Sequence, residues 1–375
     1  MTTVVLAAYD VANTPGIGGH FWVYAQYADA LRRLGCDVYW LEQLTSTGDP
    51  ATDHARVRTL ADRLERLGLA DRLLVHVCQA GSAPTPEPAW VTCSAARAEG
   101  VFRRTDLLLN FHYAMSPELL TRFRRTALVD IDPGMLQNWW RSGRLDLHDH
   151  DVRFSIGENL PTDNGLWHHT FPAVSLELWP YRPDPGCRRF TTVSSWWAGE
   201  WLTDGTEVYD NNKRASFLAF ADLPRRTDQE LELALALSDY DRPEVQRLEG
   251  LGWRIRPAAE VAGSPWDFQA YVQSSRGEFS CAKEAYLRYG NGWISDRTVC
   301  YLASGKPAVV QHTGSSRHLP EGRGLFRFLT VDQAVAAFAE INGAYEQHCR
   351  AAREIAEEFF SARKVVARLL RLALA

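Results

Sequence analysis

The chain has 375 residues, of which 46% are hydrophobic and 23% charged, and its formal net charge is −5. These values are typical of a soluble globular protein, and the length suits two domains. The acidic balance gives no general attraction to nucleic acid or anionic membranes, so an anion-binding site has to be local. No apolar run reaches membrane-spanning length, and the N-terminus lacks the basic region of a signal peptide. Seven scattered cysteines without a Cys-x-x-Cys pair favour reduced thiols in a cytoplasmic protein.

The first 160 residues alternate predicted strands and helices. A buried strand at 4–8 leads through a glycine-rich loop at 16–19 into an amphipathic helix ending at Leu34, and a second strand follows at 38–41. This order predicts a parallel sheet with right-handed crossovers. The remaining elements are strands at 73–77, 106–110, 127–131 and 152–156 and helices at 53–67 and 117–125. Residues 1–160 are therefore predicted to form one Rossmann-like half.

Residues 161–185 contain five prolines and little periodicity, which predicts a linker between domains. The α/β pattern then restarts over 186–375. We predict strands at 190–194, 253–256 and 308–311 and helices at 213–220, 229–237, 267–273, 296–302, 331–345 and 349–372. The last helices either close the second half or cross back onto the first. Two such halves facing each other would leave a cleft at the carboxyl ends of both sheets, where ligands bind in doubly wound folds.

The most informative pattern lies between residues 275 and 310. It consists of Ser-Arg-Gly-Glu-Phe-Ser at 275–280, Gly-Trp-Ile-Ser-Asp-Arg at 292–297 and Leu-Ala-Ser-Gly-Lys-Pro-Ala-Val-Val at 302–310. We interpret it as a loop, a polar helix start, a helix, a Gly-Lys-Pro turn and a strand. This order turns backbone N–H groups toward an anion.

With these motifs the chain resembles the GT-B glycosyltransferases, and in particular a poorly characterised bacterial branch of them. The resemblance covers nearly the whole length and is sharpest between Arg276 and Gly314. It implies two facing Rossmann-like domains, the first on the acceptor side and the second binding a nucleotide sugar. It places residues 293–295 beside the donor sugar and phosphates, and Lys213 where the family often has a phosphate-binding lysine. The candidate donor-binding residues are Gly18, Gly19, Trp196, Lys213, Arg276, Glu278, Lys283, Trp293, Ser295, Asp296, Arg297, Thr313 and Gly314.

The chemistry of such a reaction explains why cations matter. A leaving nucleoside diphosphate gains negative charge as the glycosidic bond breaks, and fixed cations and helix N-termini stabilise that charge without rearranging. Arg276, Arg297, Lys213 and Lys283 are therefore the candidates for diphosphate contacts, with Ser295 as helix N-cap. The alternative for each cation is an ordinary solvated surface charge.

Three further residues of the second half have open roles. Asp296 in the first helical turn either takes part in the site or only favours the helix dipole. Glu278 either binds a sugar hydroxyl or anchors Arg276. Retaining members of the family commonly have a ribose-binding glutamate where this chain has Cys300, so the stereochemical outcome stays open. Cys300 is interpreted as a packed core thiol.

Candidate bases come from the first half. His20 follows the glycines at 16–19 and could take a proton from an acceptor, although a histidine that caps this turn is an equal alternative. His112 is a second candidate base or sugar ligand. Asp130 and Asp132, in Asp-Ile-Asp-Pro-Gly, could orient an acceptor, although Asp-Pro-Gly also makes a good turn. The glycines let the backbone approach a phosphate or the acceptor closely, or they only form a flexible turn.

Two tryptophans, Trp196 and Trp293, are predicted to line the donor pocket, since aromatic faces stack on nucleobases and sugars. The pair His168 and His169 has no carboxylate-rich partner cluster, so we predict no metal site and no cofactor.

The leading hypothesis is a metal-independent glycosyltransferase that acts on a nucleotide sugar and a small acceptor, with no nucleic-acid partner. A nicotinamide or flavin oxidoreductase is an alternative, because Gly16 and Gly18 follow a strand and Glu42 ends the next one. Against it, Phe21 replaces the third glycine of that fingerprint. A non-catalytic nucleotide-binding or sugar-binding protein is the other alternative. The donor base, the sugar, the acceptor, the stereochemistry and the oligomeric state stay open.

Overall fold

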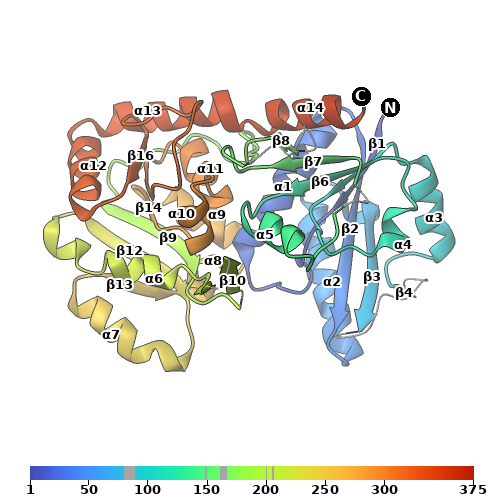
Figure 1. The fold of residues 1–375 in the computed structure, drawn as a ribbon, viewed down its shortest axis with the longest axis horizontal. Helices are drawn as coiled ribbons and strands as arrows, with labels where there is room; N and C mark the ends of the chain where they lie inside the picture. The colour runs from blue at the N-terminus through green and yellow to red at the C-terminus, as the bar shows by residue number, and fades with distance from the viewer. Residues whose placement is uncertain (80–88, 148–149, 161–166, 200, 205–206) are drawn as a thin grey trace.

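The computed structural model describes residues 1–79, 89–147, 150–160, 167–199, 201–204 and 207–375. Two α/β halves lie side by side (Figure 1). The first contains an eight-stranded sheet in the order β4-β3-β2-β1-β5-β6-β7-β8, parallel except for β4. Its strands are β1 Thr3–Ala7, β2 Asp37–Ser46, β3 Leu73–Gln79, β4 Ala89–Trp90, β5 Leu107–Asn110, β6 Thr126–Asp130, β7 Val152–Ser155 and β8 Trp167–His169.

Alternation along the strands gives the first sheet two apolar faces. Val4 and Leu6 of β1 belong to one core cluster, and Val5 and Ala7 belong to another, as expected for a strand buried on both sides. The helices of this half are α1 Gly18–Arg33, α2 Pro50–Glu65, α3 Ala95–Arg104, α4 Pro117–Leu120 and α5 Met135–Arg141. Side-chain caps fix where several of them begin; Ser94, for example, accepts a hydrogen bond from the backbone of Arg97 in α3.

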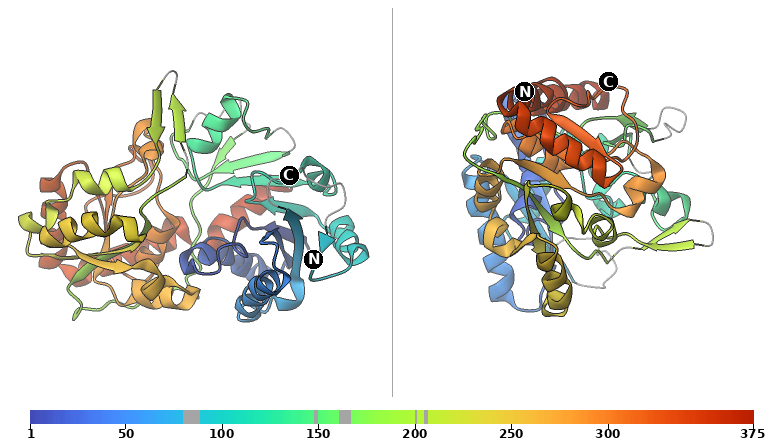
Figure 2. Two further views of the ribbon diagram at one scale, coloured as in Figure 1. Left: turned by 90° about the horizontal axis from the view of Figure 1, so that it is seen from below. Right: turned by 90° about the vertical axis from the view of Figure 1, so that its left-hand side faces the viewer.

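The second half contains a six-stranded parallel sheet in the order β13-β12-β9-β14-β15-β16. Its strands are β9 Arg189–Ser195, β12 Glu230–Ala236, β13 Arg254–Pro257, β14 Gly277–Ser280, β15 Ala308–Gln311 and β16 Leu325–Phe328. A separate hairpin of β10 Trp201–Asp204 and β11 Glu207–Asp210 projects from the body of the protein (Figure 2). The helices are α6 Arg214–Ala219, α7 Arg242–Gly250, α8 Ala258–Ala262, α9 Pro265–Gln273, α10 Glu284–Tyr289, α11 Asp296–Ala303, α12 Val331–Gly343, α13 Tyr345–Ile355 and α14 Ala362–Ala373.

The final helix crosses back to the first half, as the red segment along the top of Figure 1 shows. α14 packs against α1. The crossing is anchored by hydrogen bonds from Arg125 Nε to Ala373 O at 2.7 Å and from Ala362 N to Val174 O at 2.9 Å. The single helix predicted at 349–372 is instead divided by a π-helical turn over Ala356–Phe360. No helix in the described part of the chain is both long and apolar enough to cross a membrane.

Three sequence predictions are wrong in detail. The segment 229–237 was predicted to be helical and instead contains strand β12, and the loop predicted at 275–280 contains β14 in the middle of the sheet. The linker predicted at 161–185 contains β8, which belongs to the first sheet, while residues 161–166 lie outside the described part. In β12 the alternating Leu231, Leu233 and Leu235 fill the core, so packing outweighs the helix propensity of leucine, alanine and glutamate.

Candidate active site

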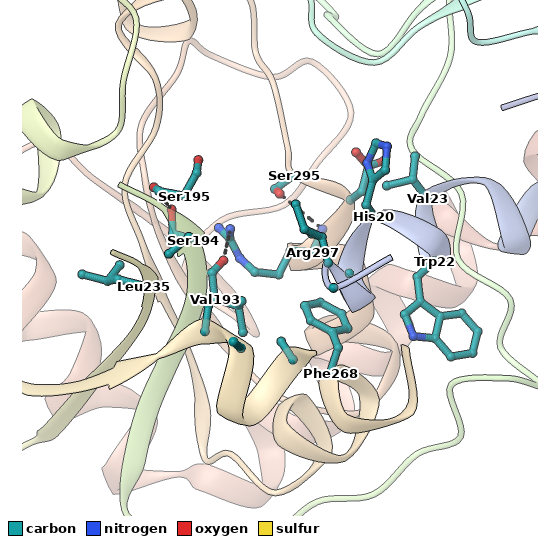
Figure 3. A pocket seen from close by; sticks show the side chains of 18 of the residues that line it. His20, Trp22, Val23, Val193, Ser194, Ser195, Leu235, Phe268, Ser295 and Arg297 are labelled. Carbon is teal, nitrogen blue, oxygen red and sulfur yellow. Dashed lines mark hydrogen bonds between the residues drawn. The ribbon is translucent and has the colours of Figure 1, made fainter. Parts of the chain in front are cut away.

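A cavity of about 500 Å³ lies between the two halves (Figure 3). One wall is the start of α1, from Gly16 to Val23. The facing wall consists of the carboxyl ends of β9 and β12 together with α8, α9 and the first turn of α11. This placement agrees with the cleft that two doubly wound sheets are expected to leave. We call it the interdomain cavity.

Arg297, on the first turn of α11, is fixed rigidly in this cavity. Its Nε donates to Glu278 Oε1 at 2.7 Å, and its Nη1 donates to Val193 O at 2.9 Å, a contact visible in Figure 3. Ser295 caps the helix by accepting from the backbone N–H of Arg297 at 3.2 Å. Glu278 is fully buried, and its Oε2 has no hydrogen-bond partner among the described residues. Glu278 therefore anchors Arg297 rather than Arg276.

Arg276 does not belong to the site. It immediately precedes β14, at the amino end of that strand, whereas the interdomain cavity lies at the carboxyl ends of the sheet. Its Nε donates to Asn342 Oδ1 at 2.7 Å, and its guanidinium lies 3.8 Å from the ring centroid of Tyr345. The structure therefore does not bring Arg276 together with Arg297, because the guanidinium of Arg276 is held by Asn342 and Tyr345, outside the lining of the interdomain cavity.

The two lysines predicted to contact the diphosphate, Lys213 and Lys283, are not among the residues that line the interdomain cavity. Lys213, half-buried before the start of α6, has its Nζ 5.8 Å from the ring centroid of Trp293. No hydrogen bond or ion pair holds this ammonium group in the described part of the chain. Burial, assisted by the nearby charges of Arg297 and Lys283, lowers the pKa of Lys213 to about 7. Lys283, immediately before α10, forms an ion pair with Asp132 of the first half at 3.3 Å.

The loop that carries Trp293 is held in shape by its own backbone. Gly292 has φ of +71° and donates its N–H to Thr313 O at 2.8 Å, and Thr313 Oγ1 donates to Trp293 O at 2.8 Å. Gly314, at φ +123°, leaves no room for a side chain, since a Cβ there would lie 2.2 Å from Gly290 O. Thr313 and Gly314 therefore hold the shape of the loop at 290–293 through direct contacts with it.

Aromatic stacking fixes Trp293 in turn. Its ring stacks on Tyr286 with centroids 4.0 Å apart and planes 15° apart, and its Nε1 has no partner among the described residues. Trp196 behaves differently: it is 1% exposed, donates to Glu244 Oε2 at 2.7 Å and belongs to the second core cluster. The prediction that Trp196 lines the pocket is wrong. Its neighbour Trp197 is the exposed member of the pair.

Asp296 lines the interdomain cavity on the first turn of α11. Burial, followed by the charge of Asp132, raises its pKa to about 7. Cys300, one turn further along the helix, is buried, and its thiol donates to Asp296 O at 3.2 Å. It is a packed core thiol that receives a hydrogen bond from Gln26 at 3.5 Å.

His20 lines the opposite wall of the cavity. Its Nε2 lies 2.6 Å from Tyr9 O, and because a carbonyl only accepts, Nε2 must carry the proton. The neutral ring therefore keeps Nδ1 as its basic nitrogen. Burial lowers the pKa of His20, which favours this neutral form.

The glycines before His20 serve packing between the halves. A Cβ on Gly18 would lie 2.0 Å from Ser264 O, and a Cβ on Gly19 would lie 3.0 Å from the ring of Phe268. Both neighbours belong to the second half, at the start of α9. The close backbone approach predicted for these glycines is therefore made to the facing domain.

His112 is 5% exposed and is not among the residues that line the interdomain cavity. Its ring packs edge-on against Tyr9 with centroids 5.0 Å apart, and burial lowers its pKa to about 4. Nδ1 of His112 has no partner among the described residues.

Asp132 follows β6 and reaches the second half. It accepts hydrogen bonds from Tyr286 Oη and Lys283 Nζ. Asp130 behind it is buried, accepts from Gln137, Ser155 and the backbone of Asp132, and has a pKa raised by burial to about 6. Asp130 therefore supports the turn that presents Asp132. Sequence reasoning missed Tyr286, although its position three residues after Lys283 places both beside one face of α10.

Glu42, which suggested dinucleotide binding, is fully buried. It accepts hydrogen bonds from Val11 N at 2.9 Å and from Trp40 Nε1 at 3.0 Å, so it supports the loop after β1 and cannot reach a ribose. The described residues contain no group of three or more histidine, cysteine, aspartate or glutamate side chains arranged to hold a metal ion.

No protein-family model matches the chain, and no curated relative matches its sequence. Solved structures match over the whole length. An alpha-glucosyltransferase in complex with UDP-glucose and DNA containing an abasic site is 11% identical with a TM-score of 0.63, covering 100% of this chain and 99% of the other. Anabaena HepE in complex with UDP and glucose is 13% identical with a TM-score of 0.54, covering 99% of both chains. AviGT4, a glycosyltransferase involved in avilamycin A biosynthesis, is 14% identical with a TM-score of 0.54, covering 100% and 98%. The chain therefore has the GT-B fold.

Proposed function

We propose that this protein is a glycosyltransferase that moves a sugar from a nucleoside-diphosphate donor to a small acceptor, without a metal ion. The observation that carries the proposal is the group formed by Lys213, Lys283 and Arg297 beside the N-terminus of α11. The pKa of Lys213 is lowered mainly by burial and then by Arg297 and Lys283, so both of these cations lie within electrostatic reach of Lys213. Structural neighbours solved with UDP support a nucleotide as the ligand.

The donor fits the cavity in two parts. The end lined by Leu235 and Pro257 is apolar and suits the nucleoside, while the end at Arg297 and the N-terminus of α11 suits the diphosphate. Cations and the positive end of a helix dipole stabilise the charge that grows on the leaving diphosphate. In this proposal the cations and the helix N-terminus stabilise the leaving diphosphate, as a divalent metal ion does in other enzymes.

Transfer then needs a group that accepts a proton. As an acceptor hydroxyl attacks the anomeric carbon, the bond to the diphosphate breaks and the hydroxyl proton must leave. His20 Nδ1 is the candidate base because its Nε2 is already committed to Tyr9 O. Asp132, also from the first half, is the other side chain that we propose to act on the acceptor. The net charge of −5 favours a small acceptor over DNA.

A panel of nucleotide sugars tests the proposal. The purified protein is incubated with UDP-, GDP- and TDP-sugars, and mass spectrometry detects hydrolysis or transfer. Titration calorimetry measures the affinity for UDP, GDP and TDP. Release of a nucleoside diphosphate supports an enzyme. Binding without turnover across acceptors favours a non-catalytic nucleotide-binding protein, and no binding at all overturns the proposal.

A further inference from the structure

Asp132 is a side chain of the first half that contacts Lys283 of the second half. Its Oδ1 accepts hydrogen bonds from Lys283 Nζ at 3.3 Å and from Tyr286 Oη, and its side chain is 43% exposed. The turn around it is held from both sides: Asp130 Oδ1 accepts from Asp132 N at 2.9 Å, and Asn291 Nδ2 donates to Pro133 O at 2.7 Å. The carboxylate is therefore presented to Lys283 by a supported turn.

The charge of Asp132 acts on both walls of the interdomain cavity. It raises the pKa of His20 on the first wall, against the larger effect of burial, and it adds to the effect of burial in raising the pKa of Asp296 on the second wall. It also raises the pKa of Lys213, which does not line the cavity, again against the larger effect of burial. This carboxylate thus lies within electrostatic reach of the candidate base as well as of the diphosphate cations.

Building on the proposed function, we infer that Asp132 competes with the donor diphosphate for Lys283, and that donor binding releases it toward the acceptor. A carboxylate and a phosphate are both oxygen anions that accept charge-assisted hydrogen bonds from a lysine. A diphosphate offers more charge and more acceptor oxygens than one carboxylate, so it takes over the lysine once it is bound.

The exchange has two consequences. Competition weakens donor binding, because the donor must displace a favourable ion pair. The displaced carboxylate becomes available to an acceptor hydroxyl only in the donor complex. Asp132 is therefore a positioning residue whose availability depends on the donor, and the donor binds before the acceptor.

The substitution Asp132→Asn tests this inference because it keeps the shape of the side chain and removes its charge. Titration calorimetry with the nucleoside diphosphate that the wild type binds best should show affinity about tenfold higher in the variant. The turnover of sugar transfer should fall at the same time. The matched control is Asp10→Asn, which removes another carboxylate of the first half whose charge acts on His20. Asp10 has φ of +65°, a conformation that asparagine tolerates, and its contacts are with the first half. The affinity of the Asp10→Asn variant for the nucleotide should stay within about twofold of that of the wild type.

A double-mutant cycle shows whether the effect passes through Lys283. Lys283→Met should weaken nucleotide binding, and adding Asp132→Asn in that background should give no further gain. Affinity that is unchanged or lower in Asp132→Asn alone overturns the inference and leaves the proposed function standing. A gain of the same size in the Lys283→Met background also overturns it. Failure of the wild type to bind any nucleoside diphosphate instead overturns the proposed function itself.

Discussion

Replacing Arg297 by alanine should strongly destabilise the protein. The guanidinium is 9% exposed and is the ion-pair partner of Glu278, which is fully buried. Without Arg297 the carboxylate would remain buried without its hydrogen-bonded ion-pair partner, and breaking a buried pair in this way costs about 3–5 kcal/mol of unfolding free energy. A double variant, Glu278→Gln with Arg297→Ala, should recover most of this loss, because a neutral amide is far cheaper to bury than a carboxylate.

Urea unfolding, followed by fluorescence and circular dichroism, measures these differences through the shift of the midpoint. The control is Arg226→Ala, which removes an exposed pair with Asp332 at 2.8 Å and should cost about 0–1 kcal/mol. The reasoning is refuted if Arg297→Ala costs no more than this control. It is also refuted if the double variant is less stable than the single one.

Three other predictions follow from the site. Lys213 loses its charge as pH rises through about 7, so UDP affinity should fall between pH 6 and 8. Titration calorimetry should show that UDP affinity depends less on pH in the Lys213→Met variant. Gly18→Ala should cost about 1–3 kcal/mol and lower the melting temperature, since its Cβ would meet Ser264 O; an unchanged melting temperature would contradict the domain contact. His20→Gln should reduce turnover at least about 100-fold while leaving UDP affinity within about twofold, and full turnover would place the base elsewhere.

The architecture could be predicted because parallel strands buried on both faces leave a strong signal. The strand at 4–8, the glycine loop and the helix ending near Leu34 correspond closely to β1 and α1. The strand pattern also located the carboxyl ends of the sheets. This is why Arg297, Ser295 and His20, which follow or face those ends, all line the interdomain cavity.

The errors come from contacts that only the tertiary structure supplies. Arg276 is only two residues before Glu278 in sequence, yet it precedes β14, and its guanidinium is bound to Asn342 rather than directed toward Arg297. Gly18 was interpreted as part of a loop that approaches a phosphate. Ser264 of the other half approaches this glycine instead, and the local sequence contains no signal of that contact. Tyr286 was missed for the same reason: its partner Asp132 is 154 residues away.

The central claim is that a diphosphate binds between Lys213, Lys283 and the first turn of α11. A crystal structure of the protein with UDP tests it most directly. We predict phosphate oxygens within about 2.7–3.2 Å of a lysine Nζ and of the α11 amides, with Asp132 withdrawn from Lys283. A diphosphate bound at any other place, with these lysines untouched, would contradict the account.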